Sequence, residues 1–279
     1  MKNERLDKEN VKKAVRQRYG EIARKESSCC GPTTEPACGC GAAPADISKL
    51  IGYSDEELGA VPEGADLGLG CGNPVALASL KKGETVIDLG SGAGIDCFLA
   101  ARKVGPKGKV IGVDMTAEML EKAKKNATKG GYRNVEFRMG EIEHLPVADG
   151  TADAVISNCV INLSPEKEQV FKEVFRVLRP GGRMMVSDIV LLKKLPENVA
   201  NSIAAYVGCI AGAETRSRYL GAIRKAGFSK ITIMGESSYP LDIADPAIAG
   251  AVKQLGMTPA QAKDVAAGIV SIKVQALKP

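Results

Sequence analysis

The stretch VIDLGSGAGID, residues 86–96, decides the fold of this chain. It leads from a short apolar run into three glycines, at Gly90, Gly92 and Gly94. Glycines in such a loop accept positive φ and let a ligand approach the backbone closely. The dinucleotide fingerprint G-x-G-x-x-G needs a further glycine where this chain has Ile95. Asp88, two residues ahead of the loop, repels a pyrophosphate and favours a cationic ligand.

Outward from this loop, apolar strands alternate with amphipathic helices. The seven expected strands span residues 85–90, 109–115, 135–140, 152–163, 183–192, 230–235 and 269–277. Helices are expected at 8–25, 46–58, 94–105, 117–131 and 164–178, at two places between 196 and 227 (the first carrying Cys209), and at 243–268. This alternation predicts an α/β fold, with a mostly parallel sheet that helices cover on both faces.

Three regions follow from the pattern. Residues 1–74 hold a helix and a loop rich in Cys, Gly and Pro, and we interpret them as a lid and redox segment. Residues 75–195 form the regular cofactor-binding core. Residues 196–279 form a C-terminal α+β extension that supplies the last strands.

Composition excludes several classes of protein. The 279 residues carry a net charge of +5, and residues 1–28 hold nine Lys and Arg against five Asp and Glu, so the body is nearly neutral. A nucleic-acid partner is therefore disfavoured. No apolar stretch reaches the ~20 residues that a bilayer requires. Because the charged first residues lack an apolar signal region, we expect a cytoplasmic location and no membrane partner. We also expect a monomer.

Polar residues at strand ends mark a candidate cofactor site. Asp114 ends the second strand, where an acid accepts hydrogen bonds from ribose hydroxyls in doubly wound folds, and Met115 follows it. Glu141, after the third strand, is placed to accept from an adenine amino group, with Ile142 beside the ring. Asn158 ends the fourth strand at the same carboxyl edge of the sheet.

Eight cysteines stand at 29, 30, 38, 40, 71, 97, 159 and 209. In a reducing compartment they favour metal binding or a cycling thiol chemistry over a disulfide framework. Cys97 is expected to be a small buried core residue. The first four do not match the usual C-x₂₋₄-C zinc spacing, although a structural zinc site there stays an alternative. The sole histidine, His144, is expected at the surface, so no Cys/His nucleophile pair is predicted.

Three of the cysteines come from three separate segments and could converge over the cofactor. They are Cys71 before the core, Cys159 directly after Asn158, and Cys209 in the C-terminal region. Three thiolates around one site suit a soft, thiophilic centre. Without further information, Cys159 at a strand end is equally well explained as a core thiol.

The core resembles the class I S-adenosylmethionine-dependent methyltransferases over roughly residues 75–190. The resemblance rests on the glycine loop with Asp88, Asp114 and Glu141, and on the LRPGG turn at 178–182. It implies a Rossmann-like sheet of seven strands with the last one reversed, and S-adenosylmethionine as methyl donor.

More specifically, the chain resembles the arsenite methyltransferases. LGCGNP at 69–74, DLGSGAGIDC at 88–97 and SNCVINLSPEK at 157–167 carry the match, with looser support from GCIAGA at 208–213. The resemblance implies that Cys71, Cys159 and Cys209 bind As(III), with no permanent metal. It implies that an N-terminal cysteine, Cys29 or Cys30, pairs with Cys71 as a disulfide during turnover. It further implies that Tyr19 caps the cofactor site.

The predicted function is methylation of arsenite and methylarsenicals by in-line transfer from S-adenosylmethionine to thiol-bound As(III). Methyl-cation transfer formally gives As(V), and a cysteine pair supplies the two electrons that restore As(III). Thioredoxin or a small thiol is then the reductant. One alternative is an O- or C-methyltransferase acting on a quinone-type metabolite, and another is a thiol-rich metal-binding protein without turnover.

Overall fold

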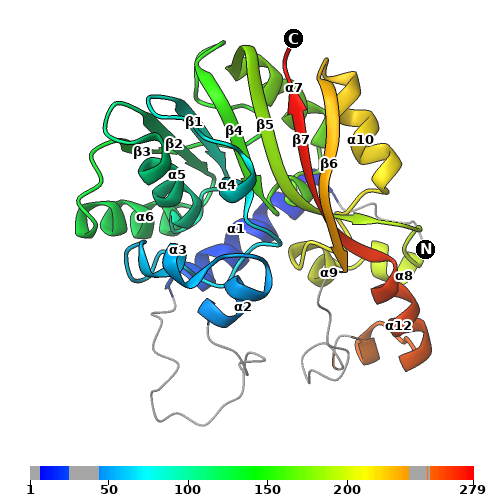
Figure 1. The fold of residues 1–279 in the computed structure, drawn as a ribbon. Helices are drawn as coiled ribbons and strands as arrows, with labels where there is room; N and C mark the ends of the chain where they lie inside the picture. Colours follow the sequence, from blue (N-terminus) through cyan, green and yellow to red (C-terminus); the bar gives the residue numbers. More distant parts are fainter. Residues whose placement is uncertain (1–6, 25–43, 239–249, 251) are drawn as a thin grey trace, which may run out of the picture.

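The computed structural model of this chain describes residues 7–24, 44–238, 250 and 252–279. A single seven-stranded sheet runs through the molecule in the order β3-β2-β1-β4-β5-β7-β6. Five strands pair in parallel from β3 to β5, whereas β7 is antiparallel to both of its neighbours. The expectation of a seven-stranded sheet with its last strand reversed is therefore confirmed (Figure 1).

The strands lie close to the expected positions. They are β1 (Thr85–Leu89), β2 (Lys109–Asp114), β3 (Val135–Met139), β4 (Ala152–Asn158), β5 (Leu178–Leu191), β6 (Ser229–Ser238) and β7 (Ile269–Leu277). Successive side chains of a strand point to opposite faces of the sheet. In β1, Ile87 and Leu89 pack into one apolar cluster and Val86 into another. Both faces of the sheet are thus buried, as in other helix-covered parallel sheets.

Helices cover both of these faces. The helices of the described residues are α1 (Lys8–Arg24), α2 (Pro44–Leu50), α3 (Asp55–Gly59), α4 (Pro74–Leu77), α5 (Ile95–Val104), α6 (Ala117–Lys129), α7 (Lys167–Val177), α8 (Glu197–Ala200), α9 (Ile203–Val207), α10 (Arg216–Lys225) and α12 (Pro259–Ala267), with a 3₁₀ turn η1 (Ile161–Leu163). Helices α7 and α10 pack on one face, and α4 and α5 pack on the other. The long N-terminal helix α1 passes below the carboxyl edge of the sheet (Figure 1).

Two of the candidate site cysteines occupy different local structures from those expected. The strand predicted at 152–163 ends at Asn158, and Cys159 turns the chain with φ of +60° before η1. Cys209, expected within a helix, follows α9 instead, with φ of +63°. The helix expected at 46–58 is broken into α2 and α3 around Gly52, whose φ is +110°.

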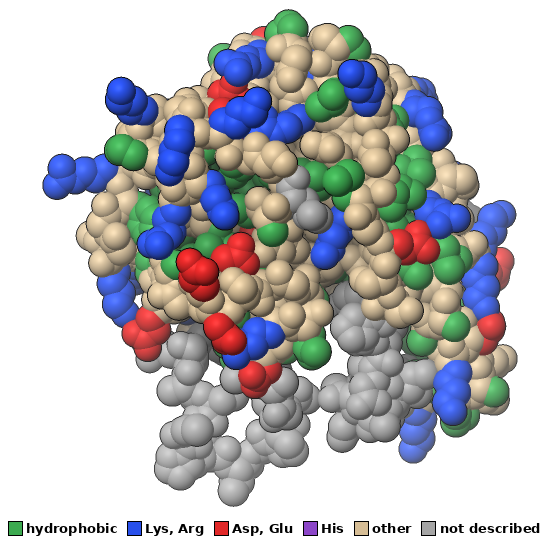
Figure 2. Space-filling view, viewed as in Figure 1, with side chains coloured by type: hydrophobic (Ala, Val, Ile, Leu, Met, Phe, Trp, Pro, Cys, Tyr) green, Lys and Arg blue, Asp and Glu red, His purple; other side chains and the backbone are tan. Residues whose placement is uncertain are grey.

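Several expectations fall on segments outside the described residues. These include all four N-terminal cysteines, Cys29, Cys30, Cys38 and Cys40, and part of the helical stretch expected at 243–268, where α12 is described. The surface view shows Lys and Arg side chains spread over one face with acidic and apolar side chains between them (Figure 2). Among the described residues, no helix has the length and apolar character needed to span a bilayer.

Candidate functional site

A cavity of about 560 Å³ opens at the carboxyl edge of the sheet. This is where open α/β sheets bind their ligands. The strand ends of β1, β2 and β4 form its floor, and α1 and the turn after α9 complete its walls. Predicted site residues that line it are Tyr19, Asp88, Gly90, Gly92, Asp114, Met115, Ile142, Asn158, Cys159 and Cys209.

The glycine loop forms one side of this cavity. Asp114 accepts hydrogen bonds from the Gly92 N–H (2.9 Å) and the Thr116 N–H (2.8 Å), which fixes its carboxylate at the end of β2. Burial raises the pKa of Asp114, and the backbone hydrogen bonds oppose that shift. The hydroxyl of Ser91 is buried at the cavity without a hydrogen-bond partner in the described structure. The loop thus offers both an acceptor and an unsatisfied hydroxyl to a ligand.

Two further carboxyl groups face the cavity together. Asp88 lies in β1 just before the glycine loop, and Asp96 lies in the first turn of α5. Both side chains line the cavity and are almost completely buried. Asp96 accepts from the Tyr53 hydroxyl at 2.8 Å. Burial raises the pKa of Asp96 to about 6, and burial followed by the Asp96 charge raises that of Asp88 well above its usual value. No salt bridge within the described residues involves either group. This pair is therefore suited to a cationic part of a ligand.

Asn158 connects the end of β4 to the loop that carries Cys71. Its side-chain oxygen accepts from the Cys71 N–H at 2.9 Å, and its amide group donates to the Gly72 carbonyl at 2.7 Å and to the Tyr53 hydroxyl at 2.9 Å. A Cβ at Gly70 would lie 2.7 Å from the Asn158 amide nitrogen, so this approach requires a glycine. Asn158 both lines the cavity and fixes the position of Cys71.

Three thiols lie close together beside the cavity, where Cys159 contacts both Cys71 and Cys209. Cys71, Cys159 and Cys209 are each at most 7% exposed and are unpaired. The Cys209 thiol donates to the Cys159 carbonyl at 3.5 Å and lies 3.9 Å from the Tyr19 hydroxyl. Tyr19 thus reaches the thiols from α1. The structure thus brings together three cysteines that come from three separate segments of the sequence.

The thiols are held in their protonated form. Burial is the main cause that raises the pKa of Cys71. The hydrogen bond with Cys159 and then burial raise the pKa of Cys209 well above its usual value. For Cys159, the contact with Cys209 lowers the pKa, but Cys71 and burial outweigh it, so the net shift is also upward. Because the three thiols are neutral, they are suited to a neutral substrate whose own groups accept the thiol protons on binding.

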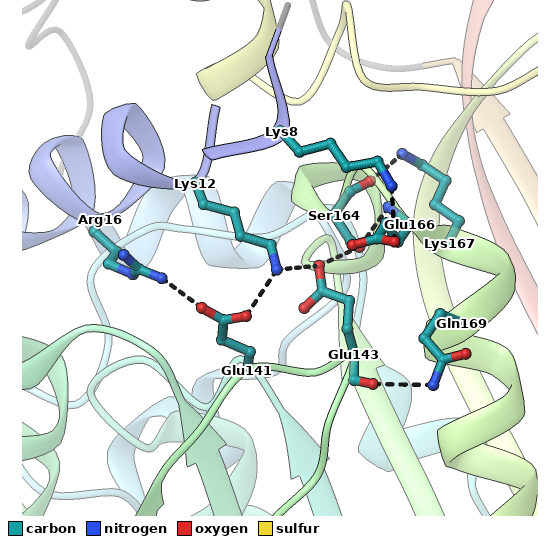
Figure 3. A network of polar contacts seen from close by, with 9 residues as sticks. All are labelled: Lys8, Lys12, Arg16, Glu141, Glu143, Ser164, Glu166, Lys167 and Gln169. Atoms are coloured by element: carbon teal, nitrogen blue, oxygen red, sulfur yellow. Dashed lines mark hydrogen bonds and ion pairs between the residues drawn. The ribbon is translucent and has the colours of Figure 1, made fainter. Parts of the chain in front are cut away.

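Glu141 has a different environment from the one expected. It receives ion pairs from two residues of α1, Lys12 at 2.7 Å and Arg16, and it is not among the residues that line the cavity (Figure 3). The hydrogen bond with Lys12 lowers its pKa. Lys12 also lies 3.5 Å from Glu143, which does line the cavity. Glu141 in this structure fastens α1 over the site.

Other predicted residues have structural positions. Gly94 caps the start of α5 with φ of +101°, and a Cβ there would lie 2.8 Å from the Phe98 ring. Cys97 is fully buried and donates to Asp88 at 3.2 Å. Cys29 and Cys30 are outside the described residues. Cys71 is adjacent to the cavity wall but is not itself part of the lining.

Sequence reasoning missed several residues of this site. Asp96 follows the glycine loop after Ile95. Asp188, which has a carboxylate oxygen within 4.8 Å of the Cys71 and Cys159 sulfur atoms, interrupts the apolar run MMVSDIVLL. Both therefore left a signal in the sequence. Tyr53 and Lys12 left none, because only the folded chain brings them to the strand ends. These missed residues are mainly charged side chains whose role depends on neighbours far away in sequence.

Comparison with known proteins identifies the family. A family model described as "Methyltransferase domain" matches residues 80–227. The arsenite methyltransferase of Halobacterium salinarum is 50% identical over 81% of this chain and 59% of its own length. The human arsenite methyltransferase is 32% identical over 78% of this chain and 58% of its own length.

A solved structure gives the same result. The crystal structure of an arsenic(III) S-adenosylmethionine methyltransferase from Chlamydomonas reinhardtii superposes with a TM-score of 0.63 at 34% identity, covering 83% of this chain and 73% of that one. The chain spans about three fifths of the length of the two curated relatives named above. Given these matches and the methyltransferase fold, the chain belongs to the arsenite methyltransferase family of S-adenosylmethionine-dependent methyltransferases.

Proposed function

We propose that this protein methylates trivalent arsenic, which Cys71, Cys159 and Cys209 hold while S-adenosylmethionine occupies the cavity beside them. The observation that carries the proposal is the convergence of three buried thiols from distant segments beside that cavity. Soft thiolate ligands select thiophilic centres such as As(III). Arsenite and methylarsenicals are accordingly the proposed substrates.

The protonated state of the thiols fits arsenous acid. Each Cys S–H gives its proton to one As–OH group as an As–S bond forms, and water leaves. Three such exchanges need no net base and place no net charge in the buried site. The raised pKa values of the three thiols are therefore compatible with loading a neutral substrate.

Further residues that line the cavity fit the methyl donor. Asp88 and Asp96 provide negative charge for a ligand that carries an ammonium group and a sulfonium. Asp114 offers carboxylate oxygens to ribose hydroxyls, and Ile142 and Met115 provide apolar surface. When bound, S-adenosylmethionine supplies an electrophilic methyl group. The cavity volume and this distribution of charge support its binding here.

The chemistry requires orientation rather than acid or base catalysis. As(III) bound by three thiolates keeps a lone pair and carries no proton to remove. We propose that Cys159 and Cys209, which line the cavity, aim this lone pair along the line of displacement at the methyl group. Positioning two reactants in this way is worth up to ~7–11 kcal/mol in well-oriented systems.

A disulfide cycle completes the proposal. Methyl-cation transfer leaves arsenic formally as As(V), and two electrons from a pair of thiols return it to As(III) while a disulfide forms. We propose Cys71 as one partner and Cys30 or Cys29 as the other. Thioredoxin or a small thiol then reduces the disulfide.

Serine variants test the thiol site. Cys159→Ser and Cys209→Ser are expected to abolish methylation of arsenite and to leave S-adenosylmethionine affinity nearly unchanged, measured by calorimetry. Cys97→Ser is the matched control, because its hydroxyl can still donate to Asp88 and it contacts none of the three thiols. Full activity in either test variant contradicts a three-thiol site. That result would favour an O- or C-methyltransferase acting on a small metabolite.

A further inference from the structure

One buried carboxyl group beside the thiols has no role in the proposed reaction. Asp188 lies in β5 and is 0% exposed. One of its carboxylate oxygens and the sulfur atoms of Cys71 and Cys159 all lie within 4.8 Å of one another. As(III) needs only three thiols, so the arsenic chemistry leaves this carboxylate unexplained.

The surroundings of Asp188 hold it in place, and its hydrogen bonds and Lys167 oppose the burial that raises its pKa to about 7. It accepts from the Tyr219 hydroxyl at 3.0 Å and from the Ile189 N–H at 2.9 Å. The ammonium group of Lys167 interacts electrostatically with it and is itself held by the Ser164 carbonyl at 2.7 Å. Buried charges persist in proteins when they are paired or coordinate a metal.

We propose that Cys71, Cys159 and Asp188 form a binding site for a soft divalent cation of the Zn²⁺ or Cd²⁺ class. Two thiolates and a carboxylate are ligands that Zn²⁺ takes in proteins, at ~2.3 Å to sulfur and ~2.0–2.2 Å to oxygen. Around a tetrahedral ion with these bond lengths the ligand atoms lie ~3.4–3.8 Å apart. Ligand atoms that are already within 4.8 Å of one another therefore need only a small contraction to bind the ion. A fourth position is open to water on the cavity side, because Cys159 lines the cavity.

The charges of this site balance. A divalent cation with two thiolates and one carboxylate carries one net negative charge, which the Lys167 ammonium offsets. Binding transfers the thiol protons to solvent and needs no oxidant or reductant. Because the cation must displace these protons, its binding is expected to release acid into the buffer.

The cation set and the proposed arsenic set share two ligands and differ in the third. Both use Cys71 and Cys159, but arsenic takes Cys209 whereas the cation takes Asp188. A bound cation is therefore expected to exclude arsenite, and this competition rests on the proposed function. Cation binding itself does not rest on the proposed function. Substitution of Asp188 is therefore expected to impair cation binding, whereas substitution of Cys209 is expected to impair arsenite binding.

Cadmium titration tests the site. The 279-residue chain with Cys29, Cys30, Cys38 and Cys40 replaced by Ser serves as the parent, so that these thiols do not bind the probe. Under anaerobic, reduced conditions, Cd²⁺ is added and the ultraviolet thiolate-to-cadmium absorption is followed. We expect one Cd²⁺ per chain. Asp188→Asn is expected to weaken binding by at least the ~10–100-fold that loss of an outer-sphere partner causes.

Two control variants accompany the titration. Tyr219→Phe removes a hydrogen bond to Asp188 but no ligand atom, so it is expected to bind Cd²⁺ more tightly than Asp188→Asn. Cys209→Ser is expected to keep Cd²⁺ binding and to lose arsenite binding. Thermal unfolding without metal verifies that each variant is folded.

The outcomes are distinct. Absence of Cd²⁺ binding by the parent overturns the proposal, as does unchanged affinity in Asp188→Asn or an equal loss of Cd²⁺ and arsenite in that variant. If the parent binds Cd²⁺ through Asp188 but never binds arsenite, the cation site stands and the proposed function fails.

Discussion

Asp96 lies buried beside Asp88 in a cavity where a cationic ligand requires negative charge. Burial raises its pKa to about 6, so the folded protein holds this proton more tightly than the unfolded chain does. Its contribution to folding stability is thus present at low pH and is lost as the pH rises from about 4 to about 6. A cationic ligand has the opposite requirement, because it binds the ionised form.

Cofactor affinity is therefore expected to fall in acid. With a pKa of about 6, S-adenosylmethionine should bind about tenfold more weakly at pH 5 than at pH 8, measured by calorimetry. Asp96→Asn should bind weakly at both values. The exposed Asp149→Asn is the control and should keep the parent's profile. A pH-independent affinity in the parent would show that Asp96 does not face the cation.

Gly90 is required both by its backbone conformation and by the lack of space for a side chain. Its φ is +64°, and a Cβ there would lie 2.4 Å from a methyl group of Val160. Gly150 has a similar φ of +59° with nothing within 4 Å of its Cβ position. Gly150→Ala should cost about 1–2 kcal/mol of unfolding free energy for the left-handed backbone alone. Gly90→Ala should cost a further ~1–3 kcal/mol for the overpacking, measured by urea unfolding. Equal losses would show that Val160 moves aside freely.

Single residues differed in how far the sequence could predict them. The glycine loop and the acid that ends β2 follow from local spacing, and both line the cavity. The possible convergence of the three thiols followed from where their segments fall in the predicted fold, whereas their role as As(III) ligands was implied only by the resemblance. Asp188 and Tyr53 could not be assigned a role, because a buried polar side chain is explained only by partners that the fold brings to it.

Among the structural elements, too, some were predictable from the sequence and others were not. Strand and helix positions in the core followed the hydrophobic pattern closely, whereas the turns that carry Cys159 and Cys209 did not. Both cysteines have positive φ, which residues other than glycine adopt infrequently and which leaves no mark in the sequence. The apolar run after Asn158 resembles a continued strand, but tertiary packing turns it into η1.

Ion pairs hold helix α1 over the site, and they are expected to differ in how much they contribute to the unfolding free energy. Lys12 is 5% exposed and pairs with Glu141 and with the buried Glu143, whereas Lys8 pairs with Glu166 at the surface (Figure 3). Breaking a buried pair strands a charge, so Lys12→Met should lower the unfolding free energy by about 3 kcal/mol. Lys8→Met should cost at most about 1 kcal/mol. Urea unfolding compares the two, and similar losses would contradict a special role for Lys12.

At the scale of the whole molecule, the C-terminal strands complete the sheet of the core. β7 lies between β5 and β6 and pairs with β5 from Arg183 to Leu191. The boundary that we expected at residue 196 therefore separates segments that share one sheet. The sequence pattern located these strands but not their order, because pairing between distant strands depends on the assembled fold.

Removal of β7 is accordingly expected to unfold the whole protein. A chain that ends at Gly268 loses the strand between β5 and β6 and exposes the unpaired edge of β5. It should show no cooperative thermal transition by circular dichroism. A chain that lacks only Pro279 should unfold like the parent. A cooperative transition of the shortened chain near the parent's midpoint would mean that the core folds without its C-terminal strands.

Methylation of arsenic at a site of three thiols is the function that we propose for this protein. The most direct measurement incubates the purified protein with arsenite, S-adenosylmethionine and a reductant, with and without thioredoxin. Chromatography with elemental detection then separates the arsenic species. We predict methylated arsenic in step with S-adenosylhomocysteine, with turnover increased by thioredoxin and absent in Cys159→Ser. Arsenite that binds and is never methylated, or methylation that persists without Cys159, would contradict arsenic methylation at a three-thiol site.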